Sequence, residues 1–459
     1  MTSSKKIKIL VLSHISDLKG GAEMSMLDTF DYWNEHYNIE PEFIMRQPAR
    51  ALADALNDRG WKYYALNYTF WSDAVPPVKS YDIFRSALNN TKAIFDIEEI
   101  IKTSKPDLVM TNSIVAPWAA IAASFQKVPH AWFVREYGDL DHGRVFEIGR
   151  ESTFEDVSTL SDLVITNSIT LADHVKQYVD SKKVTTLYTP FKLQSMRERL
   201  LESVSSPFIN KDSLKLVMTG TLAPTKGQQE AIKAVGLLND KGFDTEICLI
   251  GGSASPEFKS ELDSIIKEHN ISGKVHFVGH QENPFAYIAL ADVGVMASRR
   301  EAFGRVTFEY LAAGKPVVGA NSGATPEIVQ DGRSGYLYEQ GDSNGLAKAL
   351  SNYAKNKSLI KKHGIYGKKS TDEMMTGSFG ADALFEKVHK IAVNGYDEKR
   401  VRSALNFSHQ WLKYLSIAQK SINETKTASI RSLVKIRIRQ EVKNVYYKAK
   451  KIESLILRK

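Results

Sequence analysis

The residues of this chain whose types and spacing best suit chemistry are two glutamates, Glu301 and Glu309, with seven residues between them. Ala302, Phe303 and Gly304 follow the first of them and lead into a predicted helix. The start of a helix binds anions, because its first N–H groups have no partner within the helix. A carboxylate accepts paired hydrogen bonds from vicinal hydroxyls. The pattern therefore fits a nucleotide-linked sugar, with one glutamate on a hexose diol, the other on a ribose diol and the diphosphate over the helix start.

Glycines bound the predicted helix: Gly304 opens it, and Gly314 stands where a left-handed cap ends a helix. An apolar strand is predicted directly afterwards, at Pro316–Ala320. With a rise of about 1.5 Å per residue, Glu309 is expected roughly 12 Å further along the axis than Glu301. The glutamate pair alone fits an ordinary amphipathic surface helix equally well, so the flanking residues decide between the two interpretations.

The flanking residues carry a family resemblance. From Glu301 the chain reads EAFGRVTFEYLAAGKPVVGANSGATPEIVQDGRSGYL, with Phe-Gly after the first glutamate and Gly-Lys-Pro-Val after the second. This stretch resembles the retaining glycosyltransferases of family 4, whose signature is two glutamates in this spacing and context. The resemblance covers about residues 7–395 and is most specific at 298–335.

The resemblance implies the GT-B fold, which has two Rossmann-like domains with parallel sheets facing a central cleft. It also implies transfer of a hexose-type sugar from a nucleotide diphosphate, with retention at the anomeric carbon. The breadth of the family makes UDP the expected nucleotide and a glycan or lipid-linked molecule, in cell-surface polysaccharide or glycoconjugate synthesis, the expected acceptor. No metal or other cofactor is expected, because cationic side chains and amides can stabilise the departing diphosphate.

Length and composition describe a globular protein of 459 residues, long enough for two or three domains. Cys248 is the single cysteine, which excludes an intramolecular disulfide and cysteine-cluster metal sites and indicates a reducing compartment. The apolar run Ile9–Leu12 is too short for a secretion signal, and the weakly polar run Ile114–Phe125 is short of the roughly 20 residues that span a bilayer. We therefore expect a cytoplasmic protein that at most rests on the inner face of the cell membrane.

The positive charge is concentrated in the C-terminal tail. Residues 401–459 hold 14 Lys/Arg against 3 Glu, whereas the remainder holds 47 basic and 50 acidic residues. Within 430–459 one helical stripe is apolar and consists of Val434, Ile438, Val442, Val445, Ala449, Ile452 and Ile456. A basic amphipathic helix suits an anionic membrane surface, where a lipid-linked acceptor is found. A helix packed on the enzyme body, a coiled coil with a partner and contact with an acidic polymer remain alternatives, but nucleic acid is not expected because no reader motif accompanies the charge.

Strand-like runs alternate with helical patterns, which predicts an α/β protein with parallel sheets covered on both faces. About twelve strands exceed one ordinary sheet, so we expect two. In terms of the resembled family, residues 1–195 form the acceptor domain and residues 205–375 the donor domain. One of the last helices, at about 380–395, returns to the first domain, and 401–459 form a helical tail.

On the donor side, a glycine-rich loop follows the first predicted strand of the second domain. Family members often have Gly-Arg-Leu and then Lys-Gly at this place, and their Arg and Lys hold the diphosphate through charge-assisted hydrogen bonds. Lys226 keeps the lysine, but Thr221 stands where the Arg is common. Arg299, Arg300 or Arg305 could supply the missing charge, and the sequence does not decide among them.

Other glycine-containing segments are candidate contacts of the donor. Gly251 follows a strand and either touches sugar or phosphate through its backbone or only forms a tight turn. The segment of His280 resembles the family segment that lies along the nucleotide base. Gly20 and Gly21 match the glycine-rich loop that many relatives place between donor and acceptor, because glycine lets a backbone approach a ligand closely. Glu23 follows on the acceptor side.

Arg135 ends a predicted strand near the place where many relatives carry a histidine. A guanidinium stays protonated, so it would orient the acceptor or assist phosphate departure rather than act as a base. A structural ion pair of Arg135 with Glu136 or with an aspartate is the alternative. We expect Arg135, Lys226 and Glu301 to be catalytic, and we place Glu136 and Asn112 on the acceptor side.

Asn112 belongs to a repeated pattern, since Asp107–Ser113 and Asp162–Ser168 are near copies that end in Thr-Asn-Ser. In parallel sheets, ligands lie beyond the carboxyl ends of the strands. This places the Asn and Ser that end each copy, Asn112, Ser113, Asn167 and Ser168, at the cleft edge. Helix N-caps are the alternative for each.

Two other functions share the expected fold. A non-catalytic partner subunit is suggested by Thr221, and the intact set of Lys226, Glu301 and Glu309 argues against it. A nucleotide-sugar epimerase needs no sugar acceptor. A dinucleotide oxidoreductase is not favoured, because Gly20-Gly21 lacks the G-x-G-x-x-G spacing.

Overall fold

A computed structural model describes residues 6–18, 21–74, 80–188, 193–252, 254–375 and 380–396. Gly20 and the tail 401–459, with its predicted amphipathic helix and membrane-binding stripe at 430–459, lie outside these residues. No helix within the described ranges is long and apolar enough to cross a membrane.

The first sheet has seven parallel strands in the order β3-β2-β1-β5-β6-β8-β9. Its central strands are nearly continuous apolar runs, as expected of a parallel sheet covered by helices on both faces. The strands are β1 (Ile7–Ser13), β2 (Ile39–Arg46), β3 (Lys62–Leu66), β5 (Leu108–Asn112), β6 (His130–Val134), β8 (Leu163–Thr166) and β9 (Val184–Thr186). The helices of this part are α1 (Gly21–His36), α2 (Ala51–Asp58), α3 (Ser80–Ser104), α4 (Trp118–Phe125), α5 (Asp139–His142), α6 (Arg150–Leu160) and α7 (Ile169–Val175). A separate antiparallel pair joins β4 (Ser72–Ala74) to β7 (Arg144–Phe146).

The second sheet has six parallel strands in the order β12-β11-β10-β13-β14-β15. These strands are β10 (Leu214–Thr219), β11 (Thr245–Ile250), β12 (Val275–Gly279), β13 (Val293–Met296), β14 (Val317–Ala320) and β15 (Gly335–Tyr338). The associated helices are α8 (Leu193–Arg199), α9 (Gln228–Asp240), α10 (Pro256–Glu268), α11 (Pro284–Leu290), α12 (Arg305–Ala312), α13 (Thr325–Ile328), α14 (Ser343–Lys355) and α15 (Ser358–Met375). The predicted α/β class with two Rossmann-like parallel sheets is confirmed, and both sheets belong to one compact unit.

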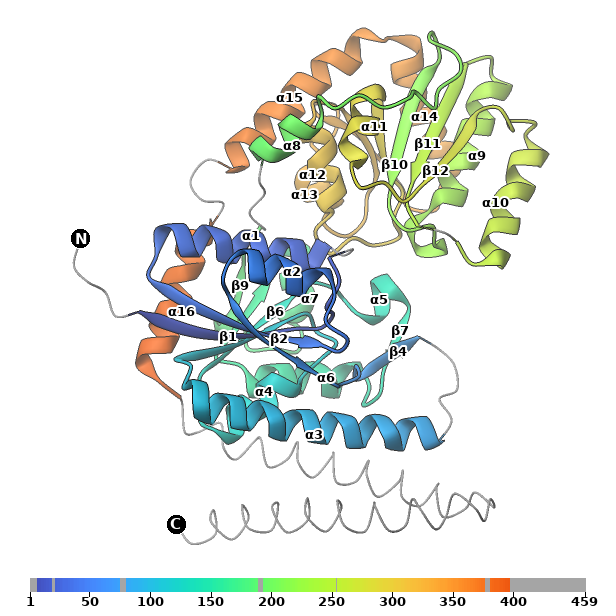
Figure 1. The fold of residues 1–459 in the computed structure, drawn as a ribbon. Coiled ribbons are helices and arrows are strands. Elements are labelled where there is room, and N and C mark those ends of the chain that lie inside the picture. The colour runs from blue at the N-terminus through green and yellow to red at the C-terminus, as the bar shows by residue number, and fades with distance from the viewer. Residues whose placement is uncertain are drawn as a thin grey trace, which may run out of the picture. The chain divides into compact units, whose positions relative to one another are not determined.

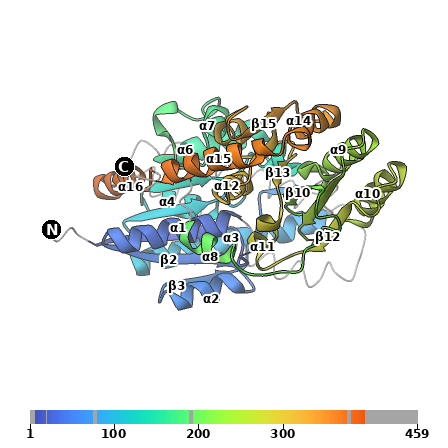
Figure 2. The same ribbon diagram turned by 90° about the horizontal axis from the view of Figure 1, so that it is seen from above.

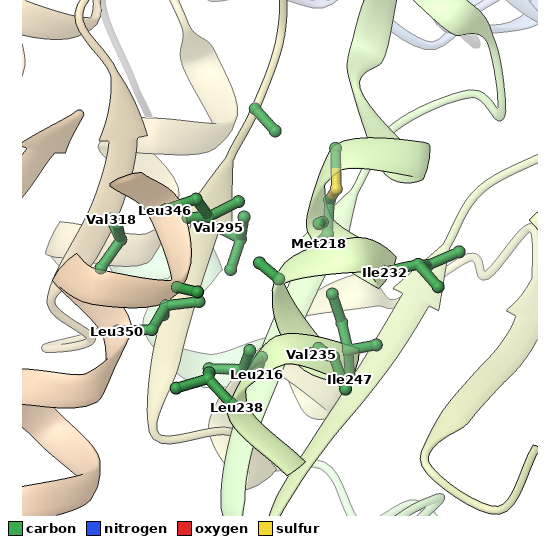
Figure 3. Packing of buried hydrophobic residues seen from close by; sticks show 14 of the residues in the cluster. Leu216, Met218, Ile232, Val235, Leu238, Ile247, Val295, Val318, Leu346 and Leu350 are labelled. Atoms are coloured by element: carbon green, nitrogen blue, oxygen red, sulfur yellow. The ribbon is translucent and has the colours of Figure 1, made fainter. Parts of the chain in front are cut away.

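Figures 1 and 2 show α9 beside α10 and α14, and the core beneath α9 and α14 is drawn in Figure 3. Leu216, Ile247 and Val295 project from the sheet toward Val235 of α9 and Leu350 of α14, and all five are at most 1% exposed. Burying one such side chain contributes about 1.5–3 kcal/mol. The sheet and its helices therefore form a rigid support for the loops at the strand ends.

An aspartate directly precedes three of the central strands and makes the same contact each time. Its carboxylate accepts a hydrogen bond from a backbone N–H at the start of the neighbouring strand. These bonds run from Lys8 N to Asp107 (2.9 Å), from His130 N to Asp162 (2.8 Å) and from Lys215 N to Asp292 (2.9 Å). Each one fixes the register of two parallel strands at their amino ends.

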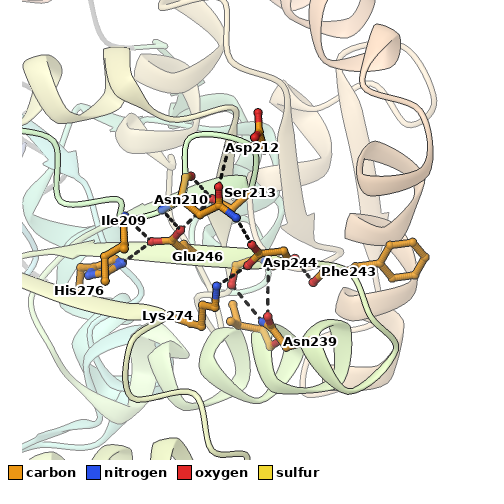
Figure 4. Close-up of polar contacts among 12 residues, drawn as sticks. Ile209, Asn210, Asp212, Ser213, Asn239, Phe243, Asp244, Glu246, Lys274 and His276 are labelled. Carbon is orange, nitrogen blue, oxygen red and sulfur yellow. Dashed lines mark hydrogen bonds and ion pairs between the residues drawn. The ribbon is translucent and has the colours of Figure 1, made fainter.

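Glu246 of β11 organises the amino-terminal edge of the second sheet (Figure 4). Its fully buried carboxylate accepts hydrogen bonds from Ile209 N and Asn210 N at 2.8 Å each and from Ser213 Oγ at 2.9 Å, and it pairs with His276 Nε2 at 2.8 Å. Burial alone would raise the pKa of Glu246, but these hydrogen bonds bring it below its ordinary value. The carboxylate thereby holds the entering segment of the chain against the sheet.

The helix α16 (Ala381–Asn394) packs on the first sheet's domain, against α1 (Figure 1). Trp33 Nε1 donates to the carbonyl of Ala381 at 3.0 Å, Tyr37 donates to Asp382 at 2.6 Å, and Phe385 stacks on Tyr37 with 3.8 Å between ring centroids.

Glu327 of α13 links the two sheets' domains at the start of α7. Its carboxylate accepts hydrogen bonds from the backbone N–H groups of Ile169 (2.9 Å) and Thr170 (2.6 Å) and from the hydroxyl of Tyr188 (2.7 Å). One carboxylate thus satisfies helix-start N–H groups that the helix itself leaves without partners.

Candidate functional site

A cavity of about 490 Å³ is lined by loops that follow the strands of both sheets, and it is called the cleft cavity below. The predicted site residues that line it are Gly21, Glu23, Arg135, Glu136, Lys226, Glu301, Ala302, Phe303 and Gly304. Lining residues that the sequence did not single out for the site include His14, Ser25, Asp141 and Arg144. The position of the cavity, beyond the carboxyl ends of parallel strands, is the usual place for ligands in such folds.

Lys226 and Glu301 form an ion pair in the cavity, with 2.6 Å between Nζ and Oε1. Lys226 ends the short turn Pro224–Lys226, and Gly227 follows with a left-handed φ of 81°. A Cβ at Gly227 would lie 2.1 Å from the carbonyl oxygen of Ala297, so only glycine allows this loop to pack against the end of β13. The charge of Glu301 raises the pKa of Lys226, which keeps the ammonium protonated at neutral pH.

The loop that carries Glu301 leads into α12 through Gly304, whose φ is 76°. The helix begins at Arg305, so the separation of about 12 Å expected for continuous helix from Glu301 is wrong. Only the four steps from Arg305 to Glu309 rise along the helix axis, which amounts to about 6 Å. The predicted glycine boundaries agree with the structure, since Gly314 follows the helix with a φ of 74°.

Glu309 is buried, with 7% of its surface exposed, and does not line the cleft cavity. Burial raises the pKa of Glu309, although Arg305 Nε lies 3.2 Å from its Oε1. Arg305 lines the cavity and also lies 3.2 Å from Ser25 Oγ and 3.5 Å from Asp28 Oδ2, both in α1. The expected ribose-binding carboxylate is therefore paired with an arginine that contacts the first domain.

The structure separates the three arginines that the sequence left as alternatives. Arg300 and Arg305 line the cleft cavity, whereas Arg299 lines a second pocket of about 450 Å³. The Arg300 guanidinium lies 5.2 Å from the ring centroid of Tyr137, and within the described part of the chain it has no carboxylate partner. Arg300 therefore offers the cavity an uncompensated positive charge.

Arg135 is almost fully buried, with 6% of its surface exposed. Its Nε donates to Asn112 Oδ1, and its guanidinium lies 3.6 Å from the ring centroid of Phe133. Burial lowers the pKa of Arg135 to about 9, which leaves the group protonated at neutral pH. Asn112 does not line the cleft cavity but holds the arginine that does.

The two near-copy strands end differently. Ser113 has a left-handed φ of 98°, and its hydroxyl donates to Glu136, which also accepts from Ile114 N at 2.8 Å. Ser168 instead accepts from Leu171 N at 3.1 Å and caps α7. The helix-cap alternative is thus correct for Ser168, while Ser113 orients a carboxylate of the cavity.

His14 is a cavity residue that the sequence reasoning missed. Its Nδ1 lies 2.8 Å from Oε1 of the fully buried Glu23, which also accepts from Ser13 Oγ at 3.1 Å. Burial alone would lower the pKa of His14, but Glu23 raises it above its ordinary value. His14 could have been found from the sequence, because it is a polar residue directly after the apolar strand β1, at the end of the strand where ligands bind.

Besides Glu309, three predicted donor contacts lie outside the cleft cavity, namely Thr221, Gly251 and His280. The side chains of Thr221 and His280 are exposed. A Cβ at Gly251 would lie 1.9 Å from the carbonyl oxygen of Gly220, so close packing explains this glycine without a ligand. Their contact with a donor stays a prediction.

Among the described residues, no group of three or more His, Cys, Asp or Glu side chains is placed to hold a metal ion.

Two family models match the chain. Residues 202–370 match the model described as Glycosyl transferases group 1, and residues 20–195 match Glycosyltransferase Family 4. Among curated proteins, N-acetyl-alpha-D-glucosaminyl L-malate synthase of Bacillus anthracis is 28% identical over 215 residues, which are 46% of this chain and 55% of that protein. The D-inositol 3-phosphate glycosyltransferase of Streptomyces coelicolor is 30% identical over 271 residues, 53% of this chain and 58% of that protein. The match thus spans about half the length of these relatives.

Solved structures share the fold. Anabaena Alr3699/HepE in complex with UDP superposes with a TM-score of 0.66 at 19% identity, covering 84% of this chain and 100% of that one. Sucrose-phosphate synthase from Thermosynechococcus elongatus gives a TM-score of 0.68 at 17% identity, covering 84% and 98%.

Proposed function

The chain belongs to the group 1 glycosyltransferases of family 4, and we propose that it transfers a hexose-type sugar from a nucleotide diphosphate to an acceptor hydroxyl. UDP is the proposed nucleotide, supported by the UDP and UDP-glucose complexes of Alr3699/HepE. The proposed acceptor is a glycan or lipid-linked molecule in polysaccharide or glycoconjugate synthesis. Relatives named for lipopolysaccharide core and capsular polysaccharide synthesis support this context.

The observation that carries the proposal is the convergence of Lys226, Arg300 and the start of α12 on one cavity. A diphosphate is a dense anion that binds best to charge-assisted donors and to helix-start N–H groups. Lys226 is the stronger candidate for direct contact, since it can exchange Glu301 for a phosphate oxygen without leaving its loop. Arg300 supplies the charge that the family places at the position of Thr221.

In the proposed reaction the bond between the anomeric carbon and the diphosphate oxygen breaks while a bond to the acceptor oxygen forms. Lys226 and Arg300 stabilise the negative charge that develops on the departing diphosphate, and the acceptor proton leaves with it. These side chains take the place of a metal in the proposal. Retention at the anomeric carbon is proposed from the family.

Glu301 is proposed to hold hydroxyls of the donor sugar once Lys226 turns to the phosphate. Glu309 is proposed to bind the ribose, which requires Arg305 to give up part of its contact with Glu309. On the other side of the cavity, Arg135 stays protonated and is proposed to orient the acceptor, with Asn112 fixing its guanidinium. Glu23 and Glu136 are the proposed acceptor-side carboxylates.

The test is a thermal-shift screen of the full chain against UDP-, GDP-, ADP- and dTDP-sugars, followed by nucleotide release and product analysis with and without added acceptors. Stabilisation by UDP-sugars and acceptor-dependent release of UDP would support the proposal. Binding without any turnover would favour the partner-subunit alternative. Conversion of the donor without acceptor into an epimeric sugar nucleotide would favour an epimerase.

We further propose from the sequence that 430–459 binds an anionic membrane surface. Removal of 401–459 should abolish co-sedimentation with phosphatidylserine liposomes and leave transfer to a water-soluble acceptor unchanged. Continued liposome binding by the shortened chain would contradict this part of the proposal.

A further inference from the structure

Arg144 of β7 lines the cleft cavity from the first domain. Its Nη1 donates to the carbonyl of Ser72 at 3.1 Å, in the paired strand β4. Among the residues that the structure describes, Arg144 forms no ion pair with a carboxylate. Its guanidinium lies 5.2 Å from the ring centroid of Phe70.

A second guanidinium faces the same ring. Arg46, at the end of β2, lies 5.3 Å from the centroid of Phe70, and it too has no carboxylate partner within the described ranges. The ring of His14 is 5.9 Å from that of Phe70. A ring face attracts one cation, but two guanidinium groups at one ring also repel each other. The chain therefore gathers positive charge at Phe70.

The carboxylates of this side of the cavity have other partners. Glu23 pairs with His14 and accepts from Ser13. Glu136 accepts from the hydroxyl of Ser113 and from a backbone N–H. Asp141, the third carboxylate that lines the cavity from this domain, accepts from Tyr137 N at 2.9 Å. An anion from outside the chain would neutralise Arg144 and Arg46 without breaking these bonds.

We propose that Arg144, supported by Arg46 across Phe70, binds an anionic group of the acceptor, either a carboxylate or a phosphate. The inference rests on the proposed function, because it assigns the acceptor to the side of the cavity opposite Lys226 and Arg300. A guanidinium presents paired donors that match carboxylate and phosphate oxygens, which makes arginine the suitable residue for this task. The donor diphosphate keeps its own cations on the second domain.

The test uses the full chain saturated with UDP, so that the donor phosphate site is filled. Calorimetric titrations at neutral pH compare glycerol 3-phosphate with glycerol and D-glucuronate with D-glucose. At least one anion should bind ten times more tightly than its neutral counterpart. A preference for glycerol 3-phosphate identifies a phosphate, and a preference for glucuronate identifies a carboxylate.

Variants locate the site. Arg144→Gln should weaken binding of the preferred anion about tenfold or more while the affinity for UDP stays within twofold, and Arg46→Gln should have a smaller effect in the same direction. Arg333→Gln is the matched control, because Arg333 also lies over an aromatic ring, 5.4 Å from the centroid of Tyr366, but does not line the cavity. This control should bind the anion as the unaltered chain does.

The proposal is overturned if anions and neutral probes bind alike, if Arg144→Gln binds the anion unchanged, or if UDP abolishes the binding. Arg300→Gln separates the two cation sites, since it should weaken UDP and spare the anion probe. A chain that fails to bind any nucleotide would refute the proposed function, whereas anion binding that depends on Arg144 would then still stand.

Discussion

Glu246 and Glu309 are two buried carboxylates of the same domain, and their pKa values move in opposite directions. Glu246 accepts three hydrogen bonds and pairs with His276, and these contacts lower its pKa despite complete burial. Glu309 has Arg305 beside it, yet burial prevails and raises its pKa. The carboxylate that holds the fold receives its hydrogen-bond donors from the chain itself, whereas Glu309, the proposed ribose-binding carboxylate, receives fewer of them.

The same contrast separates the two edges of the second sheet. At the amino-terminal edge, Glu246 fixes the entering segment, as Figure 4 shows. At the opposite edge, Lys226 forms an ion pair with Glu301, and Arg300 has no carboxylate partner among the described residues. Substitutions at the two edges should therefore change different quantities, stability at the first and turnover or binding at the second.

Lys226→Ala should have the largest effect. We expect turnover to fall by about 100- to 1,000-fold, as when one preorganised donor to the developing charge is removed. The melting temperature should change little, because the ion pair is partly exposed. Lys369→Ala is the control, since Lys369 pairs with Glu373 on the surface of α15. Equal loss of activity in both variants would contradict the proposed role of Lys226 at the departing diphosphate.

Glu246→Ala should reduce the free energy of unfolding by about 2–4 kcal/mol, because the N–H groups of Ile209 and Asn210 would lose their acceptor in a buried place. Chemical denaturation measures this difference. Substitution of the exposed Glu261 by Ala, in α10, should leave stability unchanged. An unchanged free energy of unfolding in Glu246→Ala would show that the hydrogen bonds to Glu246 do not hold the segment of Ile209 and Asn210 against the sheet.

Glu309→Gln should weaken UDP binding about tenfold, which corresponds to about 1.4 kcal/mol. Ribose hydroxyls would donate to the ionised carboxylate, so binding favours loss of the proton from Glu309. Because the pKa of Glu309 is raised in the free protein, the affinity for UDP should increase as pH rises above the ordinary value of about 4.3. Titrations at pH 5 and pH 7.5 measure this change, and the glutamine variant should show a smaller one.

The smallest expected effect is the pH dependence of stability that Glu246 causes. It arises from a lowered pKa, whereas the pH dependence of UDP binding arises from the raised pKa of Glu309. The pKa of Glu246 is lowered in the folded state, so its contribution is fully present above about pH 4.3 and disappears as pH falls through the folded pKa. Glu246→Gln should flatten the acid limb of the stability curve. An acid limb identical to that of the unaltered chain would assign acid unfolding to other groups.

Much of the fold could be predicted because local patterns determine it. The run Pro316–Ala320 was predicted as a strand from its apolar residues and forms β14 from Val317 to Ala320. The strand β2 was missed, since Pro41 lies within it and a proline argues against a central strand. The short strand β15 was also missed, because four residues carry too little periodicity to identify it.

The site was predictable where its residues are adjacent in sequence and not where the fold assembles them. Glu301 and Gly304 were found from their motif. The contact of Arg305 with Asp28, the pairing of His14 with Glu23 and the place of Arg144 depend on tertiary structure, which no local pattern encodes. The near copies that end in Ser113 and Ser168 show this limit, because similar residues serve a carboxylate in one case and a helix start in the other.

The most direct measurement is a crystal structure of the full chain soaked with UDP-glucose. The account predicts that the diphosphate lies within hydrogen-bond distance of Lys226 Nζ and of the first N–H groups of α12, with the Lys226–Glu301 pair opened. A nucleotide bound away from the cleft cavity, or one bound there while Lys226 keeps its contact with Glu301 and touches no phosphate, would contradict it.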